Sequence, residues 1–148
     1  MPSVRRRAPA YPRTRHLPPV PADLADRETR ARLSGPAIRA FFNMMARWAV
    51  RDQDARVLLG GVTNGPYYEL KRHPDRVLDI DRLTRVSLLI GIFKALDILY
   101  SERLAHAWVQ LPNTSRVFGG ATPLAYMMRG GVPALMAVRR LLDARRAG

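Results

Sequence analysis

The stretch "RLTRVSLLIGIFKALDILYS", residues 82–101, decides the fold. Its apolar residues recur at steps of three and four, which is the spacing of one face of an α-helix. They are Leu83, Val86, Ile90, Phe93, Leu96, Leu99 and Tyr100, and Leu89, Ile92 and Ile98 broaden the face almost all round. A helix this apolar is typical of the buried centre of a bundle. We therefore expect a helix that begins at Asp79 or Asp81 and forms the centre of an all-α protein.

An amphipathic helix is expected upstream, beginning near Pro36. Proline is common in the first turn of a helix, and Ser34 or Gly35 provides a cap. The apolar face of this helix consists of Ile38, Phe41, Phe42, Met45 and Trp48. A second, short helix is expected over residues 52–61, "DQDARVLLGG", with Val57 and Leu58 packed inward and Gly60-Gly61 ending it.

A third helix is expected to begin after Thr63 or Asn64 and to end at Pro74, with Tyr67 and Leu70 facing the core. Three such consecutive helices suit a helix-turn-helix, whose last helix reads base edges in the major groove of DNA. The candidate DNA-binding residues are Thr63, Asn64, Tyr68, Lys71 and Arg72. The alternative is a generic three-helix corner with a solvated face.

Residues 1–33 are expected to form a flexible basic arm rich in proline and arginine. Its prolines forbid a regular helix, and its apolar residues have no period. These prolines are Pro2, Pro9, Pro12, Pro18, Pro19 and Pro21. A short helix from about Ala22 to Leu33 stays open, and a solvated tail is the favoured interpretation.

Composition limits the classes of function. The 148 residues carry a formal net charge of +13, which favours an anionic partner, either nucleic acid or an acidic protein face. Cysteine is absent, so disulfides and thiolate metal sites are excluded. The longest apolar run is well short of the roughly 18 residues that span a bilayer, and the N-terminus lacks the apolar region of a secretory signal. We expect a cytoplasmic protein.

The residues that catalysis requires do not form a recognisable set. His16, His73 and His106 are far apart and lack the spacing of metal ligands. Asp79 and Asp81 suit the start of a helix better than a metal pair. The Gly-Gly pairs lack the Lys-Ser/Thr of a phosphate-binding loop. We therefore expect no enzymatic activity, no metal and no cofactor.

The C-terminal part has a distinctive corner, "NTSRVFGGATPLAYMMRGG" at residues 113–131. Thr122 is expected to cap a short helix that starts at Pro123 and ends at Gly130-Gly131. A last helix is expected from about Pro133 to Arg146. Taken one at a time, these features describe a tight corner between core helices.

Taken in order, they resemble a known family. The chain has Trp108, then Pro112-Asn113, then Phe118-Gly119-Gly120, then Thr122-Pro123-Leu124. This order resembles the toxin-binding domain of the Xre/MbcA/ParS antitoxins. Upstream, "LLGGVTNGPYYELKR" is similar to the Xre-type helix-turn-helix of that family. The resemblance covers about residues 36–146 and implies a helix-turn-helix domain at 34–100 and a toxin-binding domain at 101–148, whereas the expected flexible arm at 1–33 lies outside it.

The resemblance also implies a function. Members are antitoxins encoded beside a RES-domain toxin that degrades NAD or ADP-ribosylates a target, and they obstruct its active site. Many members form homodimers within the complex and repress their own operon. Relatives often carry Arg where this chain has Asn64, Gly65 and Glu69, which places operator binding in more doubt than toxin binding.

Two functions are therefore expected, and they can coexist: an inhibitor of a RES-domain toxin, or a DNA-binding repressor whose C-terminal region only dimerises. For the first, the C-terminal arginines suit a cleft that accommodates phosphates. The residues expected to face the toxin are Asn113, Phe118, Gly119, Gly120, Thr122, Pro123, Tyr126, Arg139, Arg140, Arg145 and Arg146.

Overall fold

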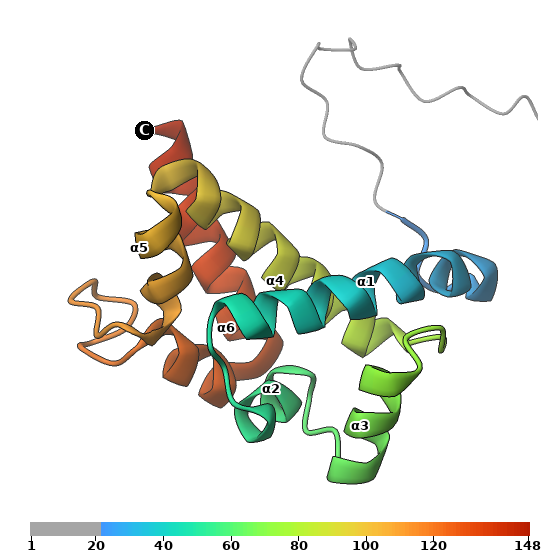
Figure 1. The fold of residues 1–148 in the computed structure, drawn as a ribbon. Coiled ribbons are helices and arrows are strands. Elements are labelled where there is room, and N and C mark those ends of the chain that lie inside the picture. Colours follow the sequence, from blue (N-terminus) through green and yellow to red (C-terminus); the bar gives the residue numbers. More distant parts are fainter. Residues whose placement is uncertain (1–21) are drawn as a thin grey trace, which may run out of the picture.

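The structure, a computed structural model, describes residues 22–148. Within them lie only helices and connecting segments, which confirms the all-α prediction (Figure 1). The elements are α1 (Arg27–Arg47), α2 (Asp52–Leu58), α3 (Asn64–Arg72), α4 (Ile80–Leu99), α5 (Glu102–Ala107), the short 3-10 helix η1 (Trp108–Gln110) and α6 (Pro123–Ala147). No helix of this described part is both long and apolar enough to cross a membrane.

Helix α4 is the centre of the bundle, with α1 packed on one side and α6 on another (Figure 1). Its buried residues are Leu83, Val86, Leu89, Gly91, Ile92, Ala95 and Leu96. The expected start is confirmed, because the Asp79 carboxylate caps α4 by accepting from Arg82 N at 2.8 Å. Ile98 was wrongly included in the apolar face, since it is 63% exposed.

The start of α1 differs from the prediction. The helix begins at Arg27, capped by Asp26, and Pro36 lies inside it. Ser34 is not a cap: its Oγ donates to Arg30 O at 2.6 Å and accepts from Leu78 N at 2.8 Å. This buried tether to the segment before α4 stabilises the helix across the proline, which lacks one backbone donor.

The expected arm therefore changes in extent. Residues 27–33 belong to α1, so the boundary expected between residues 33 and 34 falls inside a helix. Residues 1–21 lie outside the described part of the chain. The division into domains stays a prediction.

Helices α2 and α3 follow the expected order. Gly60 and Gly61 end α2 with φ of 97° and 84°, values that favour glycine. Tyr67 and Leu70 of α3 are buried, as expected. Val57 is 38% exposed, so its expected inward packing is wrong: the buried side of this segment is formed by Ala55, Leu58 and Leu59.

The C-terminal helix consists of two segments separated by a kink at Gly131, where φ is 61° and ψ is −146°. Thr122 caps the first segment by accepting from Ala125 N at 3.1 Å. Leu135, Val138 and Leu142 of the second segment are buried. The expected cap, break and core face are confirmed.

Candidate functional site

The corner after η1 is a closed loop that projects from the bundle (Figure 1). Asn113 N donates to Ala121 O at 3.1 Å, and Gly120 N donates to Asn113 O at 3.0 Å. Gly119 and Gly120 have φ of 57° and 90°, which lets the backbone turn back on itself. The two ends of the loop are thereby fixed side by side.

Phe118 anchors this loop to the bundle. Its ring packs edge-on against Trp108, with centroids 5.7 Å apart, and against Tyr126, with centroids 5.3 Å apart. Phe118 is only 5% exposed, and Pro123 is also buried. These two candidate residues therefore shape the surface from inside, whereas Gly119 and Gly120 are exposed and Asn113, Thr122 and Tyr126 are half-buried.

Exposed apolar side chains beside the loop were missed in the sequence. Leu111 is 44% exposed and Val117 is 36% exposed, and both flank the corner. The signal that could have identified these two residues is a large apolar side chain in a turn, outside any helical pattern. Together with the exposed Arg116, they make the corner a mixed apolar and basic surface.

The four candidate arginines of α6 fall into two groups. The Arg139 guanidinium lies against Gly91 of α4, where an added Cβ would overlap it, and Arg139 Nε donates to both Asp143 oxygens at 3.1 and 3.0 Å. Arg145 Nη1 donates to Tyr100 Oη at 3.0 Å. Both are therefore held against α4 or the residue that follows it.

Arg140 and Arg146 are exposed and donate no side-chain hydrogen bond within residues 22–148, whereas the exposed Arg145 is held by Tyr100. Arg146 Nη1 lies 4.0 Å from Asp143 Oδ1, a loose contact at the surface. Arg140 makes no side-chain hydrogen bond or ion pair within residues 22–148. These two guanidinium groups are the ones that a partner can reach directly.

The contacts along α4 and α6 define how the two helices pair. Arg85 lies against Gly131, Gly91 against Arg139, and Tyr100 against Arg145. The residue numbers rise together, so α4 and the second segment of α6 run in the same direction (Figure 1). The whole C-terminal surface is thereby fixed on the central helix.

The candidate DNA-binding residues share the exposed side of α3, but an acid from α2 lies among them. The Asp52 carboxylate accepts from Tyr67 Oη at 2.8 Å, Tyr68 Oη at 3.0 Å and Lys71 Nζ at 3.4 Å. The hydrogen bond from Tyr67 is the main cause that lowers the pKa of Asp52. Burial, and then the neighbouring carboxylate, raise the pKa of Tyr67. Asp52 is therefore an anion at neutral pH.

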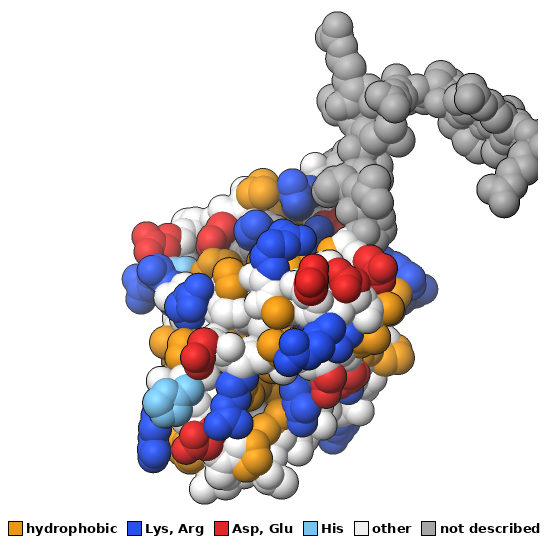
Figure 2. All heavy atoms as spheres, turned by 90° about the vertical axis from the view of Figure 1, so that its right-hand side faces the viewer, with side chains coloured by type: hydrophobic (Ala, Val, Ile, Leu, Met, Phe, Trp, Pro, Cys, Tyr) orange, Lys and Arg blue, Asp and Glu red, His pale blue; other side chains and the backbone are white. Residues whose placement is uncertain are grey.

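Arg72 of the same face is paired as well, with its Nη1 3.7 Å from Glu69 Oε1. Two of the cationic candidates thus lie next to carboxylates, which weakens attraction to phosphates. On the face in Figure 2, Lys and Arg side chains are interspersed with Asp and Glu, so no single-sign field forms there.

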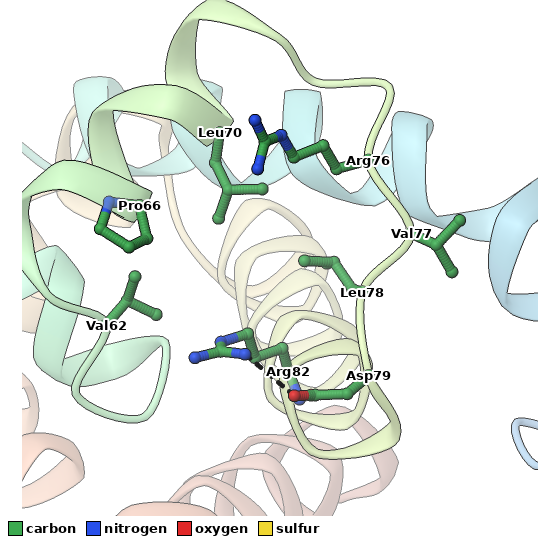
Figure 3. A pocket seen from close by; sticks show the side chains of 8 residues that line it. All are labelled: Val62, Pro66, Leu70, Arg76, Val77, Leu78, Asp79 and Arg82. Carbon is green, nitrogen blue, oxygen red and sulfur yellow. Dashed lines mark hydrogen bonds and ion pairs between the residues drawn. The ribbon is translucent and has the colours of Figure 1, made fainter.

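A hollow of about 250 Å³ lies between α3 and the start of α4 (Figure 3). Its lining is largely apolar, and Arg76 and Arg82 flank it. Arg82 Nη1 is paired with Asp79 Oδ2 at 2.9 Å. None of the candidate DNA-binding or toxin-facing residues lines this hollow.

The C-terminal part of this all-helical chain thus combines an exposed loop with reachable arginines. In the comparison with protein families, residues 94–148 match the antitoxin Xre/MbcA/ParS C-terminal toxin-binding domain. No curated protein and no solved structure matches the chain.

The match starts in the last third of α4, before the boundary expected at residue 101, and includes the closed loop and all of α6. The helices upstream of it, with their helix-turn-helix interpretation, lie outside the matched segment.

Proposed function

We propose that the protein is an antitoxin that binds a RES-domain toxin and blocks its active site, where the toxin degrades NAD or ADP-ribosylates a target. The match of residues 94–148 to the toxin-binding domain carries the proposal. A toxin of this kind acts on cytoplasmic substrates, so the proposal places the protein in the cytoplasm.

The exposed C-terminal surface supports this proposal chemically. A cleft that accommodates NAD must bind phosphates, and a guanidinium offers paired donors to phosphates and carboxylates. Arg140 and Arg146 are exposed for such contacts, and the exposed apolar Leu111, just before the closed loop, and Val117, within it, add to this surface. Arg139 and Arg145 are held by Asp143 and Tyr100, and Arg145 is exposed as well.

Co-expression with the cognate toxin tests the proposal, with growth rescue as the readout. Deleting the C-terminal region is a poor test, because Leu135 and Leu142 of α6 belong to the core. Instead, the double variant Arg140→Glu/Arg146→Glu should lose rescue while keeping its helical content. Arg32→Glu on α1, an exposed arginine outside the matched segment, is the matched control. Toxicity that persists beside the wild-type chain would refute the proposal.

Operator binding by a homodimer is the second candidate function, supported by the five candidate residues on the exposed side of α3. Titration of the free protein onto its own promoter DNA at two salt concentrations tests it. Specific binding should weaken steeply with salt, and Lys71→Gln should reduce the salt dependence by about one phosphate contact. Light scattering of the free protein measures the dimer.

A further inference from the structure

Arg85 of α4 lies where three segments far apart in the sequence meet. Its side chain is 17% exposed, and its Nε donates to Asp81 Oδ2 at 2.9 Å. On one side is Gly60 at the end of α2, where an added Cβ would lie 3.0 Å from Arg85 Nε. On the other is Gly131 at the kink of α6, where an added Cβ would lie 3.8 Å from Arg85 Nη2. One guanidinium therefore lies close to two backbone turns.

Both turns depend on glycine. Gly60 has a φ of 97° and Gly131 a φ of 61°, conformations that L side chains rarely adopt. Because Gly60 has no side chain, the guanidinium has room beside its backbone, and at Gly131 the guanidinium would be in van der Waals contact with an added Cβ. The ion pair with Asp81 holds it there from within α4.

The kink at Gly131 divides the proposed toxin-binding surface. The segment before it contains Tyr126, whose ring packs on Phe118 of the closed loop. The segment after it carries the exposed Arg140 and Arg146. The angle of the kink therefore sets the distance between the loop and the arginines.

We propose that Arg85 is a positioning residue for toxin binding. Without touching the toxin, it fixes the angle between the two segments of α6 and ties that angle to the turn before α3. The proposal rests on the proposed function of the C-terminal surface.

The first experiment compares Arg85→Gln with Arg82→Gln, using protein with ¹⁵N only in its 10 glycines. Arg82 is a matched control: it also pairs with an acid near the start of α4, at 2.9 Å, but it flanks the hollow behind α3 (Figure 3). In Arg85→Gln, the amide signals of Gly60 and Gly131 should shift together. In Arg82→Gln, the Gly131 signal should stay in place. Gly35 and Gly119 serve as internal references.

The second experiment measures affinity for the purified cognate toxin. Arg85→Gln should bind roughly 2- to 30-fold more weakly, the range for residues that act on a site without touching its ligand. Arg85→Lys should not restore full affinity, because an ammonium lacks the planar donors of a guanidinium. Arg82→Gln should bind like the wild type.

An unshifted Gly131 signal, or toxin affinity equal to that of Arg82→Gln, would overturn the proposal. If Arg85→Gln does not fold, Arg85→Lys and Asp81→Asn take its place with the same two readouts. If the wild type itself does not bind the toxin, the proposed function fails, and the paired glycine shift still decides whether Arg85 positions the kink.

Discussion

Gly91 leaves room for an arginine from another helix. A Cβ at this position would overlap the Arg139 guanidinium, which would have to leave its place and its contact with Asp143. In the wild-type background, Gly91→Ala should therefore destabilise by about 1 kcal/mol despite the better helix propensity of alanine. In an Arg139→Ala background, the same change should stabilise by about 0.5–1 kcal/mol. Urea unfolding of the four proteins measures this coupling, and equal effects in both backgrounds would contradict it.

Asp52 makes stability depend on pH in the acid range. Its pKa in the folded protein lies below the ordinary 3.8, mainly because Tyr67 donates to it. A lowered pKa contributes stability that is present above the unfolded pKa and is lost as pH falls through the folded value. Wild type should thus lose more stability than Asp52→Asn as the pH falls from about 5 to about 3, a range that brackets this ordinary pKa. Urea unfolding across this range provides the measurement, and parallel curves would exclude the mechanism.

At the scale of the element, the kink in α6 depends on the backbone of Gly131. Its φ of 61° and ψ of −146° lie near a region that only glycine adopts readily. Gly131→Ala should cost about 1–3 kcal/mol, the usual strain for such a residue. Gly65→Ala is the control, because an added Cβ there meets nothing within 4 Å. Gly65→Ala should leave the stability unchanged or raise it. If both variants lose equal stability in thermal unfolding, Gly131 has no special role.

Elements could be predicted from the sequence where local chemistry determines them. The stripe of α4 is periodic because a central helix must be apolar on most sides. Thr122 and Gly131 were recognised because caps and breaks act within a few residues. The start of α1 was wrong because Pro36 fits the first turn of a helix as well as an interior position stabilised by Ser34.

Contacts between distant residues left no such signal. Nothing near Asp52 indicates that Tyr67, Tyr68 and Lys71 converge on it. Likewise, Gly91 gives no sign that Arg139 lies against it. The candidate arginines could therefore be named from the sequence. Which of them are held by a neighbouring side chain and which are left reachable depends on the packing of α6 on α4.

At the scale of the molecule, the family match does not coincide with a folding unit. Residues 94–148 begin in the last third of α4, and the buried Leu83, Val86 and Leu89 precede them. A fragment of residues 94–148 should therefore show little helix by circular dichroism, whereas the whole chain should unfold in one transition. A cooperative thermal transition of the fragment would show that it folds independently.

The shared direction of α4 and α6 has a consequence for the chain between them. Two helices that run the same way cannot be joined by a tight turn, so the chain must cross back along the bundle before α6 can begin. Over the 20 residues of α4 this return is about 30 Å. The segment with α5 and η1 contributes to the crossing, whereas the closed loop adds almost no length because its two ends lie side by side. Shortening α5 would therefore draw α6 out of register along α4, whereas shortening the closed loop would change only the surface proposed to contact the toxin.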